Sequence, residues 1–326
     1  MKRFINIIKN NKILTSIAIL LLLAVITSGI MNGIVASYKP LSSTVQDFNV
    51  LDTLPDGSNQ KVKVILLNGQ SNASGVGSVS YLQQKSNNED FIRYEAGYDN
   101  VLINFFSENG NYSSQSKFVK AKIGQGCTPD YIGPELGLAD RLSSTYNDEL
   151  VFILKYSWGG SNLHTQWRSP SSDGDTGELY TAFINFTKTS MDYLLSKNYD
   201  ASISAMSWMQ GESDAFPPDS QAYKQNLTNF ISDTRNDLTG YYENSFYFID
   251  AGISDSPAWT DYLIINQAKS EVAALSEKNR YIDTILEGLE YDKEPVGQPD
   301  IAHFDALSTL KLGHLFADEI IFALSE

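Results

Sequence analysis

The sequence predicts an α/β fold in which a parallel sheet is covered by helices on both faces. Short, apolar segments rich in β-branched residues alternate along the chain with longer segments of helical periodicity, which is the order expected of βα units. The strand-like segments show little alternation of polar and apolar residues, as is typical of strands buried on both faces of a sheet.

Five segments are predicted strands, the last with the weakest pattern: Val62–Leu67, Leu150–Tyr156, Ile203–Trp208, Phe246–Asp250 and Tyr281–Ile285. Five are predicted helices: Pro134–Ser144, Glu178–Ser196, Ser220–Leu238, Asp261–Leu275 and Ser308–Leu324. Pro134 fits the first turn of a helix, where its missing N–H costs nothing. Ligands of such sheets bind at the carboxyl ends of the strands, so the motifs that follow strands are the candidates for a site.

Composition excludes several classes of protein. The 326 residues are 42% hydrophobic and 19% charged, an ordinary globular balance. The net charge is -15, without a basic cluster after residue 12, which argues against a nucleic-acid partner. One cysteine, Cys127, rules out a disulfide scaffold and is expected to be a small buried or half-buried residue. Three histidines leave little material for a metal centre, and we expect no metal or cofactor.

The N-terminus predicts export. Four basic residues within residues 2–12 precede an apolar run from 13 to 30, at the border between a signal-peptide core and a membrane-spanning helix. We favour an uncleaved signal anchor in residues 1–36 over a cleaved signal peptide or a buried helix. Positive charges keep the N-terminus in the cytoplasm, so a linker at 37–60 and a domain at 61–326 would lie on the extracellular face, or be secreted after cleavage.

A candidate nucleophile directly follows the first predicted strand. The strand runs into Gly69-Gln70-Ser71-Asn72, where a glycine permits a tight turn that projects the Ser71 hydroxyl. If a helix starts there, its N–H groups face developing negative charge. Taken alone, the segment also fits an ordinary Ser/Gly turn or a helix cap.

A candidate base lies near the C-terminus. Asp300 precedes His303 by three residues, a spacing that lets the carboxylate fix the imidazole tautomer. Asp305 is the alternative orienter, but it also suits the N-cap of the last helix. His314 falls in mid-helix, which argues against catalysis, and His164 is a candidate for substrate contact.

Three further polar turns follow or precede predicted elements. Gly133 stands at a helix start, Gly159-Gly160 follows the second strand, and Gln210-Gly211-Glu212 follows the third. Each fits ordinary loop chemistry on its own. Their joint placement at the ends of successive βα units points to one site.

These motifs together resemble the sialate O-acetylesterase and acetylxylan esterase branch of the SGNH hydrolase superfamily, over residues 62–324. The resemblance implies a flavodoxin-like three-layer α/β/α domain. It implies that Ser71 attacks an ester carbonyl while His303, held by Asp300, moves the proton. It also implies an oxyanion hole from the N–H groups of Ser71 and Gly133 and the Gln210 amide, with Gly160 as the alternative glycine.

Substrate contacts are expected from Gln70, Asn72, Gly160, Trp167 and Glu212. Aromatic faces pack on sugars, although a tryptophan here fits core packing equally well. One departure from the family pattern is Ala73, where the family carries methionine, which predicts a wider pocket floor.

The sequence therefore predicts a serine esterase that removes O-acetyl groups from sialic acid or from plant or bacterial polysaccharides, through an acyl-enzyme. A non-catalytic carbohydrate-binding protein on the same fold is the alternative, which the intact Ser71, Asp300 and His303 argue against. A lipase would carry a broad apolar lid, and the sequence has no such segment beyond residue 36.

Overall fold

The computed structural model describes residues 48–107 and 112–326. They form one eight-stranded sheet in the order β10-β9-β8-β1-β7-β3-β4, with β5 paired to β3. Every pairing from β10 to β3 is parallel, whereas β4 and β5 run antiparallel to β3. The strands are β1 (Lys61–Gly69), β3 (Tyr98–Ser107), β4 (Tyr112–Ser113), β5 (Val119–Ala121), β7 (Val151–Ser157), β8 (Asp200–Met209), β9 (Tyr247–Ala251) and β10 (Asn279–Ile282).

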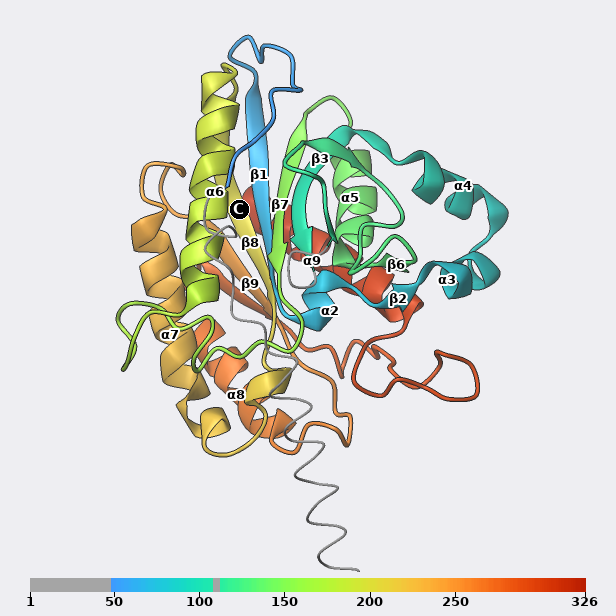
Figure 1. Ribbon diagram of the computed structural model, residues 1–326, viewed down its shortest axis with the longest axis vertical. Helices are drawn as coiled ribbons and strands as arrows, with labels where there is room; N and C mark the ends of the chain where they lie inside the picture. The colour runs from blue at the N-terminus through green and yellow to red at the C-terminus, as the bar shows by residue number, and fades with distance from the viewer. Residues whose placement is uncertain (1–47, 108–111) are drawn as a thin grey trace, which may run out of the picture. The chain divides into compact units, whose positions relative to one another are not determined.

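Helices cover both faces of this sheet. Figure 1 shows α6 (Glu178–Ser196) and α7 (Asp219–Asp237) on one side, with α5 (Pro134–Thr145) and α9 (Ala306–Ser325) on the other. The remaining elements are α2 (Ser71–Ser74), the separate antiparallel pair β2 (Gly77–Ser78) and β6 (Tyr131–Ile132), α3 (Val79–Lys85), α4 (Asn88–Ala96), the 3-10 turn η2 (Glu212–Asp214) and α8 (Tyr262–Ala273).

The three-layer α/β/α prediction is confirmed, with two corrections. The sheet is mixed at one edge, because β4 and β5 pair with β3, a strand that the sequence did not predict. The last predicted strand, Tyr281–Ile285, was misplaced: β10 ends at Ile282 and the chain then turns. The predicted helices all form, each within about two residues of its expected bounds at either end.

Part of the predicted linker at 37–60 packs on the domain. The Phe48 ring lies edge-on to Phe106, at 5.3 Å between ring centroids, and to Phe186, also at 5.3 Å. Leu54 is buried, and Gly57 N–H donates to Lys197 O at 2.6 Å. Residues 48–60 are therefore docked on the domain rather than free. No helix in the described part of the chain is long and apolar enough to cross a membrane, and the predicted anchor at 13–30 lies outside the described residues.

Helices α5 and α9 touch backbone to backbone at a pair of glycines. A Cβ added to Gly137 would lie 2.0 Å from Leu310 O, and one added to Gly313 would lie 2.1 Å from Pro134 O. Real Cβ atoms do not approach so closely, so only glycine allows this crossing. The contact fixes the start of α5 relative to α9, and with it the loop that enters α9.

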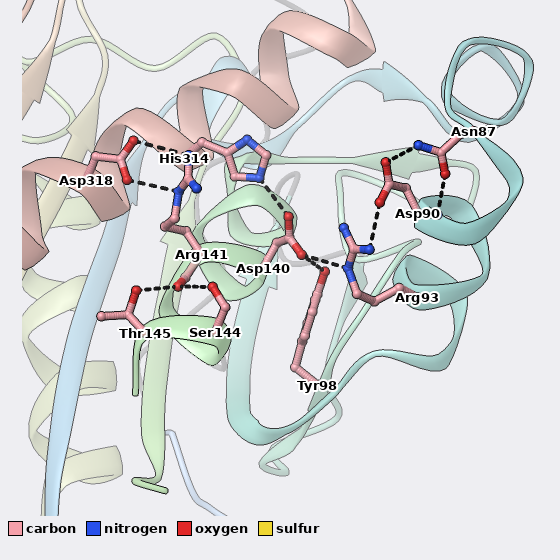
Figure 2. A network of polar contacts seen from close by, with 10 residues as sticks. All are labelled: Asn87, Asp90, Arg93, Tyr98, Asp140, Arg141, Ser144, Thr145, His314 and Asp318. Atoms are coloured by element: carbon pink, nitrogen blue, oxygen red, sulfur yellow. Dashed lines mark hydrogen bonds and ion pairs between the residues drawn. The ribbon is translucent and has the colours of Figure 1, made fainter. Parts of the chain in front are cut away.

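A polar network clamps the same two helices (Figure 2). Asp140 on α5 accepts hydrogen bonds from His314 Nε2 on α9 at 2.9 Å, from Tyr98 Oη on β3 at 2.7 Å and from Arg93 Nε on α4 at 3.0 Å. Burial alone would raise the pKa of Asp140, but these donors outweigh it and lower the pKa to about 2. His314 therefore has a structural partner on a neighbouring helix.

We expect Gly137→Ala to destabilise the fold by about 1–3 kcal/mol, because the new methyl group must displace backbone. Helix propensity alone predicts the opposite effect, because alanine in a helix is about 1 kcal/mol more stabilising than glycine. Urea unfolding measures the difference. Ser144→Ala, on an exposed position of the same helix, is the control and should stay within about 0.5 kcal/mol of wild type. A Gly137→Ala protein as stable as wild type would contradict the close crossing.

Candidate active site

Ser71 lies in a tight turn at the carboxyl end of β1. Gly69 has φ +143°, and a Cβ there would lie 1.9 Å from Met209 O, so the position requires glycine. The Gln70 N–H donates to Met209 O at 2.9 Å, which ties the turn to the end of β8. Ser71 then begins α2 and is half-buried. Ser71 therefore stands at the carboxyl edge of the sheet.

His303 and Asp300 meet in the loop before α9. His303 Nδ1 lies 2.6 Å from Asp300 Oδ2, and Asp300 Oδ1 accepts the Ala302 N–H at 3.0 Å. Partial burial would raise the pKa of Asp300, but the hydrogen bond and charge of His303 outweigh it and lower the pKa. An ionised Asp300 holds Nδ1 as the donor, which leaves Nε2 able to accept a proton.

Asp305, the alternative orienter, has another role. Its Oδ1 accepts the N–H groups of Lys293 at 3.1 Å and Glu294 at 2.9 Å. It stands at the N-cap position of α9, yet its side chain bonds the preceding loop rather than the helix. The carboxylate therefore shapes the loop that carries His303 without touching the imidazole.

Asn72 ties the nucleophile turn to the histidine loop. Its Oδ1 accepts the Phe304 N–H at 3.0 Å, and its Nδ2 donates to Glu212 Oε1 at 2.7 Å. Each bond joins a direct neighbour of Ser71 to a different segment of the site. Within the described residues, Ser71 and His303 share no direct hydrogen bond.

Two of the predicted oxyanion donors, Gly133 and Gln210, already donate hydrogen bonds within the protein. Gly133 N–H already donates to Glu135 Oε1 at 2.7 Å. The Gln210 amide is fully buried, and its Nε2 faces Asp214 Oδ2 at 2.6 Å as well as Gln70 Oε1 and Ser161 O, each at 3.2 Å. Both predicted donors therefore have acceptors inside the protein.

The glycine pair Gly159-Gly160, which follows β7, lies beside the turn of Ser71. Trp158 N–H donates to Gly69 O at 3.0 Å, which sets the end of β7 beside the turn of Ser71. Within the described part of the chain, the N–H groups of Ser71 and Gly159 have no acceptor. Gly160, which follows, is exposed at φ +66°. The geometry favours this pair over Gly133 as the glycine donor.

Most of the predicted substrate contacts are internal residues. Gly160 is exposed, whereas Gln70, Asn72, Trp167 and Glu212 are between 0% and 3% exposed. Trp167 is a core residue: its ring packs edge-on to Trp208 at 5.2 Å, and its Nε1 donates to Ser161 Oγ at 2.7 Å. Its predicted place in a sugar cleft is therefore wrong, because an indole packed on all sides offers no face to a ligand.

Gln70 and its neighbour Asp214 join the turns that follow β1, β7 and β8. Gln70 Oε1 accepts from Gln210 Nε2, Gly211 N and Ser213 N at 3.2–3.3 Å. Burial raises the pKa of Asp214 to about 7, although its oxygens accept the N–H groups of Leu163 and His164. The turns after β1, β7 and β8 are thus cross-linked beneath the site.

A fully buried ion pair supports the nucleophile turn from behind. Lys155 Nζ lies 2.7 Å from Glu135 Oε2, 2.7 Å from Ser74 O and 2.8 Å from Gln125 O. Ser74 is the last residue of α2, so the ammonium group holds the end of the helix that Ser71 begins. This pair was not predicted from the sequence, although a lysine within the apolar run of β7 was a visible signal.

A cavity of about 350 Å³ opens beside the histidine loop. It lies between α3 and the residues that precede α9. Its walls include His303, Asp300, Glu294, Tyr81 and Tyr131. Of these residues, only His303 and Asp300 were candidates from the sequence; the two tyrosines and Glu294 carry no local motif that marks them.

Removal of one partner of the buried pair should be costly. We expect Glu135→Leu to lower the free energy of unfolding by about 3–5 kcal/mol, because Lys155 is left buried and uncompensated. The double variant with Lys155→Met should lose less than the sum of the two single variants. Urea unfolding of the four proteins gives the coupling energy, and the exposed pair Lys61–Glu243 is the control, where we expect no measurable coupling. Additive losses at Lys155 and Glu135 would contradict the account.

Comparisons with known folds agree with this architecture. NanS aligns with a TM-score of 0.60 at 14% identity, over 82% of this chain and 99% of that one. A protein from Arabidopsis thaliana aligns at 0.57 with 18% identity, over 80% and 98%. A carbohydrate acetylesterase from Xanthomonas citri aligns at 0.54 with 14% identity, over 78% of this chain and 55% of that one. Such identities show a shared fold. No curated protein matches the chain by sequence.

A family model identifies the chain more directly. The model of carbohydrate esterases described as sialic acid-specific acetylesterases matches residues 61–322, which includes every catalytic candidate above. The match covers most of the chain and all of the parallel sheet. This protein therefore belongs to that family and is a carbohydrate acetylesterase, a carboxylic ester hydrolase.

Proposed function

We propose that the enzyme cleaves acetyl esters of carbohydrates through a covalent acetyl-enzyme on Ser71, with His303 as base and Asp300 as its orienter. The observation that carries the proposal is the 2.6 Å contact between His303 Nδ1 and Asp300, in a loop that Asn72 ties to the turn of Ser71. A serine hydroxyl needs such a base, because it is a weak nucleophile while it keeps its proton.

The chemistry runs in two steps. His303 Nε2 takes the Ser71 proton as Oγ attacks the acetyl carbonyl carbon, and the imidazolium then returns a proton to the departing sugar oxygen. Water attacks the acetyl-serine, loses its proton to His303, and acetate leaves as Ser71 recovers its hydrogen. Asp300 stabilises the imidazolium in both steps by holding Nδ1–H.

For the oxyanion hole we propose the N–H groups of Ser71 and Gly159. Both stand at the carboxyl ends of adjacent parallel strands, and neither has an acceptor within the described residues. Oriented donors of this kind typically contribute about 10²–10³-fold each to kcat. Gly133 and Gln210, the donors that the family resemblance implied, already have acceptors. Gly133 would have to give up its bond to Glu135, and Gln210 its bonds to Asp214, Ser161 or Gln70.

We also propose that the domain acts outside the cytoplasm. The support is the basic segment at 2–12 followed by the apolar run at 13–30. An acetylated polysaccharide or glycoconjugate on the exterior is the substrate that this placement suits.

We expect Ser71→Ala to lower kcat for p-nitrophenyl acetate and for an acetylated xylo-oligosaccharide by about 10³-fold or more, because no covalent step remains. Steady-state kinetics on the domain, with circular dichroism to verify folding, measures this. Ser86→Ala, just after α3, is a matched control outside the site and should keep wild-type activity. An active Ser71→Ala enzyme would exclude Ser71 as nucleophile.

Asp300→Asn should lower kcat by about 10²–10⁴-fold, because an amide no longer holds Nδ1 as the donor. The melting temperature should change little, since Asp300 is half-exposed in a loop. Asp318→Asn removes a carboxylate from the surface pair with Arg141 and should leave both quantities unchanged. Equal effects of the two substitutions on kcat would show that Asp300 does not orient the base.

A further inference from the structure

The cavity beside His303 has a polar and aromatic lining suited to a sugar. Tyr81 and Tyr131 contribute rings that can pack on the apolar face of a pyranose. Ser78, Ser80 and Gln84 contribute groups that bond hydroxyls. His303 lies in the same wall, whereas Ser71 is not among the lining residues, so the ester of a sugar held here must extend past His303 to reach Ser71.

The charge of this cavity has one sign. Its lining contains two carboxylates, Glu294 and Asp300, and no lysine or arginine. The surrounding segment from 290 to 305 adds Glu290, Asp292 and Asp305. An anion that entered would meet Glu294 and Asp300 in the cavity wall, where partial burial weakens screening by water and salt.

Glu294 is the fixed member of this acidic wall. It is 7% exposed, and its Oε1 accepts the Ser78 N–H at 2.7 Å. This hydrogen bond holds the carboxylate in the wall and favours its charged form, although burial outweighs it and raises the pKa of Glu294. Asp300, by contrast, already has a partner in the wall, since its Oδ2 lies 2.6 Å from His303 Nδ1.

Two lysines lie near the acidic wall, and neither lines the cavity. Lys293 Nζ is paired with Asp292 at 2.5 Å and with Glu290 at 3.5 Å. Lys85 Nζ lies 5.4 Å from the centroid of the Tyr81 ring. Lys85 is therefore the cation best placed to counter the acidic wall, and any test must include it.

We propose that this cavity holds the sugar whose acetyl ester is cleaved, that it selects an uncharged sugar over a sialic acid, and that Glu294 is the specificity-determining residue. The inference rests on the proposed function, because it takes His303 as the base beside the bound sugar. A carboxylate in the wall repels a ligand that carries a negative charge. A sialic acid would therefore be disfavoured even in a pocket whose shape accepts its ring.

The test compares an O-acetylated sialic acid methyl glycoside with its carboxyl methyl ester. The two share the cleaved ester and the ring, and they differ by one charge. We expect kcat/KM to be at least about tenfold higher for the methyl ester, with a ratio that shrinks as salt approaches about 1 M. Glu294→Gln should narrow the ratio by raising kcat/KM for the free acid. Glu243→Gln, which removes a carboxylate at the other end of β1, should leave the ratio unchanged.

Two further variants keep the test decisive. If Glu294→Gln fails to fold, Gln84→Lys adds a cation from the exposed side of α3 and should raise kcat/KM for the free acid alone. Two results would overturn the inference: faster cleavage of the free acid than of its methyl ester, or a Lys85→Gln variant that slows cleavage of the free acid alone. Neither result would touch the proposed function, as long as turnover of p-nitrophenyl acetate still depends on Ser71. Turnover of p-nitrophenyl acetate that does not depend on Ser71 would overturn the proposed function itself.

Discussion

The buried pair of Lys155 and Glu135 is the constraint on which the site most depends. Lys155 belongs to β7, the strand beside β1, and Glu135 belongs to the first turn of α5. Their charges meet beneath Ser74, the end of the short helix that Ser71 begins. Because each charge would be expensive to bury alone, the pair requires strand, helix and nucleophile turn to assemble together. Glu135 also accepts the Gly133 N–H at 2.7 Å, so it holds the residue that precedes α5 as well.

The second constraint is the glycine crossing of α5 and α9. It sets the start of α9 and so the loop that carries Asp300 and His303, far from Ser71 in sequence. Asn72 completes the connection by bonding Phe304. The groups that we propose as catalytic come from opposite ends of the domain. They are thus held by backbone contact and by one side-chain amide, rather than by a direct bond between them.

Most strands and all of the long helices could be predicted from the sequence, and the same physical reasons explain which elements could not. Strands β1, β7, β8 and β9 are apolar runs, and the period of the helices is visible. Strand β3 escaped because Asp99, Asn100 and Asn104 interrupt its apolar pattern. Asn104 is nevertheless buried, since Ser114 and Ser190 satisfy its amide. Burial of a polar residue depends on partners from other segments, which a single sequence does not show.

In the candidate site, too, local partnerships could be predicted from the sequence, whereas contacts between distant segments could not. Asp300 and His303 were found because their partnership is local, three residues apart. Trp167 was misplaced because aromatic side chains serve cores and sugar clefts alike, and only the packing around it decides. Glu135 and Lys155 lie 20 residues apart on different elements, so no local pattern could pair them. Glu294 and the tyrosines of the cavity are ordinary residues that matter through where the fold places them.

The most direct test of the account is to trap the acetyl-enzyme. The domain is mixed with p-nitrophenyl acetate, quenched in acid within the first turnovers, digested, and analysed by mass spectrometry. The account predicts an acetyl group on the peptide that contains Ser71, localised to Ser71 by fragmentation, and its absence from His303→Ala protein under the same conditions. Acetyl on another residue, or rapid turnover with direct attack of water and no acetylated protein, would contradict it.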